Sequence, residues 1–254
     1  MDSERLARLR EMGLAPTWQL RAAPAAIAMA GNAAIAGPDV AASAVDASAG
    51  ASPDDVRRPS IALLDWSALI SSIAACEACA LCKTRRHTVP GVGNTSAQWM
   101  FVGEAPGADE DAQGEPFVGQ GGKLLDNMLK AIGLDRGKNV FIANVLKCRP
   151  PNNRNPEPGE VAKCAPYLER QLELIKPRLI VALGRFAAMS LLDTDATIAS
   201  MRGRVHRYRG VPLIVTYHPA YLLRSLPEKA KAWEDLVFAR QTFAALQNNE
   251  PAQS

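Results

Sequence analysis

The chain lacks long hydrophobic runs, and this argues against a membrane protein. No stretch of about 18 consecutive apolar residues occurs, so the sequence predicts no transmembrane helix. The first residues, 1–13, carry charges of both signs and contain no apolar segment of the secretory type. We therefore expect a cytoplasmic protein that makes no contact with a membrane.

The chain also lacks a strong charge of either sign and the cysteine count of a disulfide framework. Its net charge is only +3, which is compatible with binding to nucleic acid but does not require it. It has five cysteines, an odd number in a chain without a secretory signal. This count favours a reducing compartment and a metal site over disulfides.

Regular apolar patterning is scarce in the first 60 residues. Residues 1–21 predict a short helical segment, because Leu6, Leu9 and Met12 recur at helical spacing, and this segment is a candidate for binding a protein partner. Residues 22–60 are rich in alanine, without apolar periodicity or large aromatic side chains, and predict a flexible linker. At the other end, we expect residues 247–254 to form a disordered tail.

From residue 61 onward, short apolar runs alternate with segments of helical periodicity. Four runs have the composition of buried strands, and they occupy residues 99–102, 140–143, 179–183 and 213–216. Helical spacing is present before the first run and after each of them, in residues 61–75, 122–132, 159–175, 186–192 and 228–246. This alternation predicts βαβ units and a parallel sheet with helices on both faces.

Polar and reactive residues follow every predicted strand. They are found in segments 103–107, 144–154, 184–185 and 218–224. In sheets of this kind, ligands bind beyond the carboxyl ends of the strands. The sequence therefore predicts a functional site at that edge of the sheet.

Four of the five cysteines form two pairs that a metal centre can use. Two residues separate Cys76 from Cys79, and fifteen separate Cys148 from Cys164, which is enough to cross a loop and enter a helix. Together they can supply four thiolates to one centre. The spacing alone leaves zinc and a 4Fe–4S cluster open. Cys82 has no matching partner.

Five motifs, taken in order, resemble those of the iron–sulfur (family 4) uracil-DNA glycosylases. They are CEACAL (76–81), GEAPG (103–107), EPFVG (115–119), NVLKCRPPNNR (144–154) and HPAYLLR (218–224). Each motif alone is weak, whereas the ordered set is specific, and the resemblance spans residues 61–246. One departure is Ala220, where the family often has serine.

This resemblance implies an α/β protein, a three-layer α/β/α sandwich with a central four-stranded parallel sheet, over residues 61–246. It implies a DNA-repair enzyme that hydrolyses the N-glycosidic bond of deoxyuridine in DNA, releasing uracil and leaving an abasic site. It also implies that a 4Fe–4S cluster with a mainly structural role is bound by Cys76, Cys79, Cys148 and Cys164.

The resemblance further implies roles in catalysis and uracil binding. Glu104 would position water or stabilise the cationic sugar, and His218 would donate to the uracil oxygen as negative charge develops. Phe117 would stack on uracil, and the amide of Asn144 would read its edge. Further substrate contacts are expected from Gly103, Ala105 and Gly107. A second carboxylate could share the role of Glu104, and the candidates are Asp109, Glu110 and Asp111.

Contacts to DNA are implied for two loops. Phosphate contacts are expected from Lys147, Arg149, Arg154 and Arg224. Leu222 and Leu223 resemble the apolar wedge that fills the gap left by an extruded base. The expected partner is uracil-containing DNA, single- or double-stranded, bound by a monomer.

Two other functions fit the same sequence. A non-catalytic iron–sulfur module that binds nucleic acid would not need the combination of Glu104, Asn144 and His218. An enzyme of the same superfamily that acts mainly on another deaminated base would differ only in the detailed shape of its pocket. A zinc-dependent hydrolase is disfavoured, because four thiolates would leave no open position on the metal.

Overall fold

Six strands form one sheet, in the order β1-β3-β2-β4-β6-β5. The structure, a computed structural model, describes residues 53–248, and their side chains from residue 57 onward. The four central strands of the sheet are parallel. They are β2 (Trp99–Gly103), β3 (Val140–Asn144), β4 (Leu179–Leu183) and β6 (Val211–Thr216). The short strands β1 (Val92–Gly93) and β5 (His206–Tyr208) pair antiparallel at the edges. The predicted α/β fold is confirmed, and these two edge strands extend its parallel centre.

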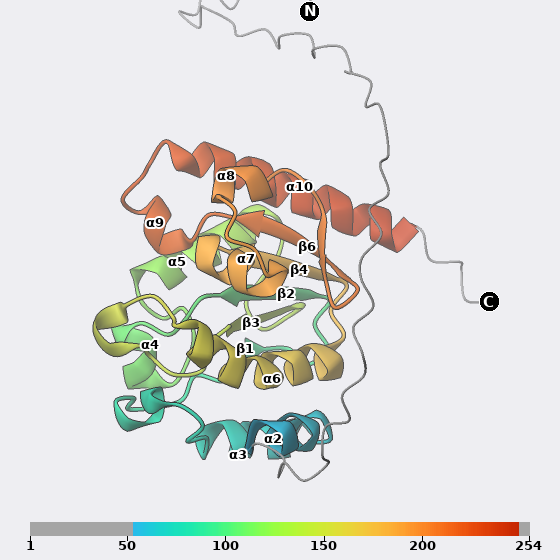
Figure 1. The fold of residues 1–254 in the computed structure, drawn as a ribbon. Helices are drawn as coiled ribbons and strands as arrows, with labels where there is room; N and C mark the ends of the chain where they lie inside the picture. The colour runs from blue at the N-terminus through green and yellow to red at the C-terminus, as the bar shows by residue number, and fades with distance from the viewer. Residues whose placement is uncertain (1–52, 249–254) are drawn as a thin grey trace, which may run out of the picture. The chain divides into compact units, whose positions relative to one another are not determined.

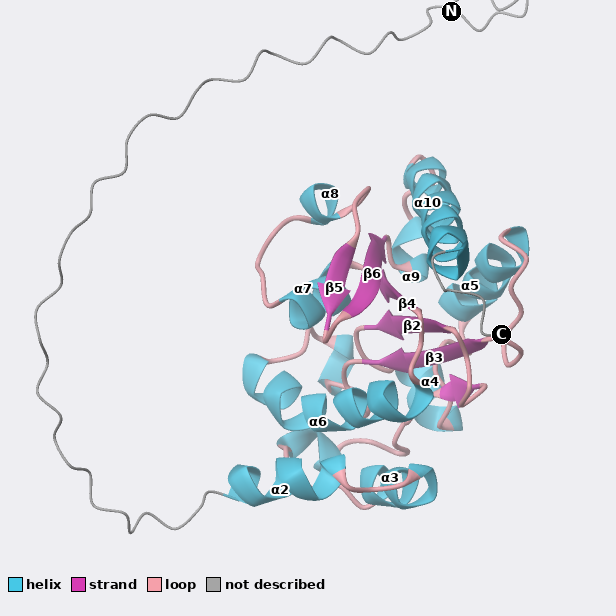
Figure 2. Cartoon of the chain, turned by 90° about the vertical axis from the view of Figure 1, so that its right-hand side faces the viewer, coloured by secondary structure: helices cyan, strands magenta, loops and turns pink. Residues whose placement is uncertain are grey.

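Helices cover both faces of this sheet (Figures 1 and 2). On one face lie α5 (Gln120–Ala131) and α10 (Glu228–Asn248), and on the other lie α6 (Pro158–Ile175) and α7 (Arg185–Leu192). Outside the second layer, α2 (Pro53–Ala62) and α3 (Trp66–Ala74) pack against α6. The remaining short helices are η1 (Ala80–Lys83), α4 (Ala108–Gln113), η2 (Pro151–Asn153), α8 (Ile198–Met201) and α9 (Pro219–Leu222).

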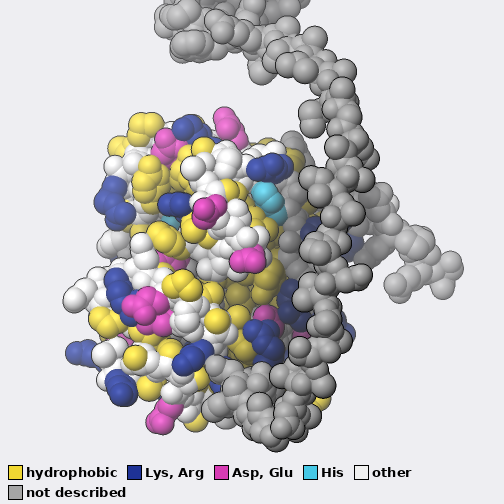
Figure 3. Space-filling view, viewed as in Figure 1, with side chains coloured by type: hydrophobic (Ala, Val, Ile, Leu, Met, Phe, Trp, Pro, Cys, Tyr) yellow, Lys and Arg dark blue, Asp and Glu magenta, His cyan; other side chains and the backbone are white. Residues whose placement is uncertain are grey.

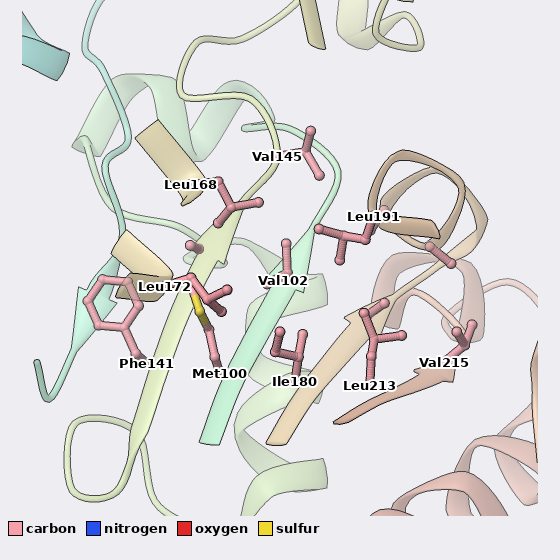
Figure 4. Packing of buried hydrophobic residues seen from close by; sticks show 14 of the residues in the cluster. Met100, Val102, Phe141, Val145, Leu168, Leu172, Ile180, Leu191, Leu213 and Val215 are labelled. Carbon is pink, nitrogen blue, oxygen red and sulfur yellow. The ribbon is translucent and has the colours of Figure 1, made fainter. Parts of the chain in front are cut away.

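The central strands are apolar throughout because both of their faces are buried. In β2, Met100 and Val102 pack toward α6 and α7, whereas Trp99 and Phe101 pack toward α5 and α10. Figure 4 shows the first of these two packed layers, in which Leu168 of α6 lies against the sheet. Strands with two buried faces read as continuous apolar runs, which is the pattern seen in the sequence.

The connections place an opening at one end of the sheet. The chain passes from β2 through α4 and α5 to β3, and then through α6 to β4 on the other side of β2. The direction of strand addition therefore reverses at β2. In open α/β sheets, the ligand crevice lies at this reversal, beyond the carboxyl ends of the strands.

The structure divides the predicted helical segment 61–75 between the end of α2 and the separate helix α3, and it corrects the boundaries of the predicted linker and tail. Helix α2 begins at Pro53, inside the segment 22–60 that was predicted to be a linker, and α10 reaches Asn248, inside the predicted tail. The cause at the first boundary is tertiary, because the Arg57 side chain donates a hydrogen bond of 2.6 Å to the carbonyl of Lys163 in α6. Local sequence does not report such a contact. The predictions for residues 1–21, and for the rest of the linker and tail, lie outside the described residues.

No helix within residues 53–248 is both long and apolar enough to cross a membrane.

Candidate functional site

A cavity of about 780 Å³ opens at the carboxyl ends of the parallel strands. Glu104 follows β2, Asn144 ends β3, Gly184 follows β4 and His218 follows β6, and all four residues line the cavity. Helices α4 and α9 lie at this end of the sheet (Figure 1). The structure therefore brings residues from four strand ends together around one space, and three of them, Glu104, Asn144 and His218, are polar.

Phe117 enters this cavity from a backbone conformation that is rare for a residue with a side chain. Its φ is 56°, in the left-handed region, and such conformations persist only where their surroundings fix them. Arg136 donates hydrogen bonds of 3.0 and 2.9 Å to the carbonyls of Pro116 and Phe117. A side chain at Gly122 would collide with this loop, because its Cβ would lie 1.8 Å from the Phe117 carbonyl oxygen.

The Phe117 ring is buried and lies against the imidazole of His218. Their ring centroids are 5.5 Å apart with an interplanar angle of 29°. Gly103 makes room for this arrangement, since a Cβ there would lie 2.6 Å from the Phe117 ring and 2.4 Å from Asn144 Oδ1. Of the predicted residues, Phe117, Asn144 and His218 therefore line the cavity, whereas Gly103 lies against Phe117 and Asn144 and does not line it.

Asn144 presents a buried acceptor without a partner. The residue is 2% exposed, and its Oδ1 accepts no hydrogen bond from the described residues. An unpaired buried carbonyl oxygen is costly, and native proteins rarely keep one unless a ligand or water satisfies it. Because Asn144 lines the cavity, a ligand that offers an N–H group there would remove this cost.

The hydrogen bonding of His218 fixes which of its ring nitrogens carries a proton. Nδ1 accepts a 3.1 Å hydrogen bond from the backbone N–H of Ala220 at the start of α9. Burial lowers the pKa of His218 to about 4, with a smaller lowering by Arg224 and an opposing contribution from Glu110. The imidazole is therefore neutral near pH 7, and its N–H is on Nε2.

The carboxyl group of Glu104 has a raised pKa. Burial raises the pKa of this carboxyl to about 7, and no ion pair or hydrogen bond from the described residues offsets it. A carboxyl group poised near neutral pH in a cavity is typical of catalytic acids and bases. The other predicted members of its loop, Ala105 and Gly107, also line the cavity.

The three carboxylates after this loop have different surroundings. Glu110 accepts hydrogen bonds from the backbone N–H groups of Gly107, Val118 and Gly119, so it ties the Glu104 loop to the Phe117 loop. Asp111 is buried and accepts from the backbone N–H of Arg86. Asp109 is exposed and lines the cavity, which makes it the carboxylate of the three with most access to a ligand.

Two of the predicted DNA contacts do not fit this structure. Lys147 is 1% exposed, and its Nζ donates to the carbonyl of Asn144 at 2.8 Å and to Gln171 at 2.7 Å, so it cannot reach a phosphate. Leu222 is also 1% exposed and packs with Leu236 in the core beside α10. The wedge prediction is left with Leu223, which is 43% exposed.

The other predicted DNA contacts lie at or near the surface. Arg224 is exposed and lines the cavity. Arg154 also lines it, but its guanidinium forms a bidentate pair with Glu160 at 2.6 and 2.9 Å. Arg149 is partly buried and donates to Asn153. On the face seen in Figure 3, Lys and Arg side chains are spread out with acidic side chains among them, so no large basic field marks it.

The four predicted metal ligands approach one another from three parts of the chain. Cys76 follows α3, Cys79 precedes η1, Cys148 follows β3 and Cys164 lies in α6. Burial raises the pKa of the Cys148 and Cys164 thiols, and the neighbouring Cys76 raises both further. The thiols are thus close enough to interact electrostatically.

Positive and N–H groups surround these sulfur atoms. Arg85 donates to Cys148 Sγ at 3.2 Å, Arg57 donates to Cys76 Sγ at 3.5 Å, and the Lys147 backbone N–H donates to Cys164 Sγ at 3.3 Å. Such donors suit thiolates that carry negative charge. Within residues 57–248, no group of three or more His, Cys, Asp or Glu side chains is arranged to hold a single metal ion.

Several residues of the site were not assigned a role from the sequence. Arg185 follows the Gly184 turn and lines the cavity, and its place directly after a predicted strand was the available signal. Tyr217 and Tyr221 also line the cavity on either side of His218. Arg136 had no signal in the sequence, because it reaches the Phe117 loop from nineteen residues away.

Comparison with known proteins agrees with this geometry. The uracil DNA glycosylase superfamily matches residues 90–237. A type-4 uracil-DNA glycosylase of Archaeoglobus fulgidus is 53% identical over 163 residues, covering 61% of this chain and 81% of the relative. One of Saccharolobus solfataricus is 43% identical over 186 residues, covering 70% and 86%. A type-5 enzyme of Pyrobaculum aerophilum is 35% identical over 152 residues, covering 53% and 66%.

This chain therefore belongs to the uracil DNA glycosylase superfamily and, within it, to the type-4 family, because the superfamily matches more than half of it and its type-4 relatives are similar over most of their own length.

Proposed function

We propose that this protein hydrolyses the N-glycosidic bond of deoxyuridine in DNA, releasing uracil and leaving an abasic site. The observation that carries the proposal is the Oδ1 of Asn144, which is buried, lines the cavity and accepts no hydrogen bond from the described part of the chain. Uracil offers an N–H at ring position 3, and cytosine has an acceptor there instead. An acceptor at this point therefore favours uracil over cytosine.

The base must leave the duplex, or come from a single strand, to reach this depth. Extrusion costs a few kcal/mol, which stacking and hydrogen bonds in the pocket must offset. The Phe117 ring supplies an aromatic surface in the lining of the cavity, and its position is set by Arg136 and by the absence of a side chain at Gly103. Stacking of Phe117 on the uracil ring is part of this proposal.

His218 supports breakage of the glycosidic bond without a change in its own protonation. Negative charge develops on the uracil oxygens as the bond to the sugar breaks. A neutral imidazole with its N–H on Nε2 donates to such an oxygen, and the Ala220 N–H on Nδ1 fixes this tautomer. Donors fixed in advance lower the cost of the transition state, because they need not reorganise.

Glu104 supplies the carboxylate for the sugar side of the reaction. In its ionised form it accepts a proton from the attacking water or stabilises the positive sugar. Its position after β2 places it in the same cavity as His218, on a separate strand. In this proposal Glu104 acts on the sugar and His218 on the uracil oxygen.

The four cysteines Cys76, Cys79, Cys148 and Cys164 would hold a 4Fe–4S cluster. Four cysteine thiolates are the donor set that a 4Fe–4S cluster would need. The donor set fits this group, since four thiols interact and are surrounded by N–H donors and two arginines. When bound, the cluster would cross-link α3, the loop after β3 and α6, which is a structural role.

Phosphate contacts would come from exposed cations at the rim of the cavity. Arg224 lies six residues after His218, is exposed and lines the cavity, whereas Arg149, on the loop after β3, is partly buried and does not line it. These residues would position the DNA strand without reading its sequence. Leu223 would fill the space vacated by the extruded base.

The test uses a labelled oligonucleotide with one uracil, followed by alkali to cut abasic sites. Cleavage at uracil is expected for the wild type, with a large loss of rate for His218→Ala. His87→Ala is the matched control, because His87 is exposed and does not line the cavity. Oligonucleotides with cytosine and with hypoxanthine, run in parallel, test the role of Asn144. Binding without cleavage of any of them would contradict the proposal and favour a non-catalytic module.

A further inference from the structure

The cavity is larger than a single uracil requires. Its volume of about 780 Å³ lies in the upper part of the range for drug-sized ligands, about 300–1,000 Å³. Uracil is a single small ring, and the residues assigned to it are Phe117, Asn144 and His218. Another part of the lining is apolar and aromatic, and consists of Phe186, Ile198, Tyr217 and Tyr221.

Tyr221 is the exposed member of this aromatic part. Its side chain is 40% exposed, and its ring lies nearly parallel to that of Tyr217, with centroids 5.6 Å apart and an interplanar angle of 16°. Tyr217 itself is only 7% exposed. An exposed ring at the wall of a cavity, supported by a buried ring, is a surface for a flat ligand.

A buried ion pair fixes the supporting ring. The Arg202 guanidinium lies 4.8 Å from the centre of the Tyr217 ring, and Arg202 Nε is 2.6 Å from Asp235 Oδ2. Asp235 is 2% exposed, so this pair lies in the interior beside the Tyr217 ring. A surface held in place before binding loses less conformational entropy when the ligand binds.

The same wall has positive charge at its rim. Arg224 is one turn beyond Tyr221, and its backbone N–H donates to the Tyr221 carbonyl at 3.0 Å. Arg185 lines the cavity beside Phe186 and is exposed. Flat rings between exposed cations are the combination that binds single-stranded nucleic acid, in which each base is followed by a phosphate.

We propose that Tyr221, backed by Tyr217, Arg202 and Asp235, is a stacking platform for the unpaired base adjacent to uracil on the same strand. This proposal rests on the proposed function and extends it to a second base subsite. The backbone N–H of Tyr221 donates to the His218 carbonyl at 2.9 Å, so the platform is fixed relative to the group that acts on uracil. A base stacked there holds its neighbour at a set distance from His218.

The test measures binding and single-turnover excision on single-stranded oligonucleotides with one uracil. In one set, both neighbours of the uracil are ordinary bases, and in two others the 5′ or the 3′ neighbour is replaced by an abasic analogue. For the wild type, removing the base on one of the two sides is expected to weaken binding about 5- to 150-fold, the range for one base–aromatic stack.

Variants then assign this effect to the platform. Tyr221→Leu is expected to weaken binding of the complete strand by the same factor and to be insensitive to the abasic neighbour. Tyr221→Phe is expected to restore the sensitivity, because it restores the ring. Trp233→Leu is the control, since Trp233 is an aromatic residue of α10 that is 47% exposed and does not line the cavity.

Three results would overturn the platform. They are equal losses by Tyr221→Leu on complete and abasic strands, no loss by Tyr221→Leu at all, or, when the same variants are measured on duplex DNA, a loss that occurs only there, which would indicate a wedge between base pairs. Failure of the proposed function is distinguished from these by the wild type on the complete strand. If that protein binds but does not excise uracil, the proposed function fails, while the binding comparison still tests the platform.

Discussion

The raised pKa of Glu104 leads to a prediction about how excision depends on pH. With a pKa of about 7, roughly 1% of the carboxyl is ionised at pH 5 and about 90% at pH 8. If the ionised form is the active one, the excision rate should rise about 90-fold over this interval. At its ordinary pKa of 4.5 the group would be about 75% ionised at pH 5, and the rate would barely change.

His218 does not produce this rise. Its pKa of about 4 leaves only about 10% of the imidazole protonated at pH 5. Neutral His218 therefore predominates across the whole interval. A fall in excision rate below about pH 7 (the acid limb of the profile) would thus reflect protonation of Glu104. The pKa values of Glu104 and His218 differ in this direction because burial favours the neutral form of each group. Burial therefore raises the pKa of an acid and lowers that of a base.

The assay is single-turnover excision with saturating enzyme at constant ionic strength, so that DNA binding does not contribute. Glu104→Gln is expected to be slower and independent of pH between 5 and 8. Asp109→Asn, which removes the exposed carboxylate of the same cavity, is expected to keep the acid limb. A flat wild-type profile, or an unchanged limb in Glu104→Gln, would refute the reasoning.

The same shift has a consequence for stability. Because folding raises the pKa of Glu104 from 4.5 to about 7, the fold favours the neutral carboxyl. The native state is therefore penalised progressively as the pH rises from 4.5 through 7, and the penalty persists above 7. Glu104→Gln should raise the Tm at pH 8 and leave it nearly unchanged at pH 4, and a lower Tm at pH 8 would contradict this.

Three further predictions concern the supports of the site. Arg136→Met removes the donors to the Pro116 and Phe117 carbonyls and should slow single-turnover excision about 10- to 100-fold. Arg136→Lys should recover part of the rate. A wild-type rate in Arg136→Met would contradict a role of Arg136 in positioning Phe117. Gly103→Ala places a Cβ 2.6 Å from the Phe117 ring, so excision should be lost while circular dichroism shows an intact fold; an active variant would show that the ring can move. Cys164→Ser should lose bound iron and lower the Tm, whereas Cys82→Ser should change neither, as measured by iron content and thermal melting; equal iron in both variants would contradict the ligand assignment.

Local sequence was enough to predict the elements that position the site. The central strands are apolar on both faces, so they appear as uninterrupted runs, and the rule for open α/β sheets places ligands after them. Glu104, Asn144 and His218 each follow or end such a run, and the structure has all three around one cavity. Their adjacency follows from parallel strands that end at one edge.

Tertiary structure decided which side chains are accessible, because burial depends on contacts between distant residues. Lys147 is of a residue type that often binds phosphate, yet its ammonium group is buried and donates a hydrogen bond to the Gln171 side chain of α6. Leu222 and Leu223 are equivalent in sequence, and the turn of α9 directs one into the core and the other to solvent. The extent of the folded domain was settled in the same way, since α2 packs on α6 through Arg57, which contacts a residue 106 positions away.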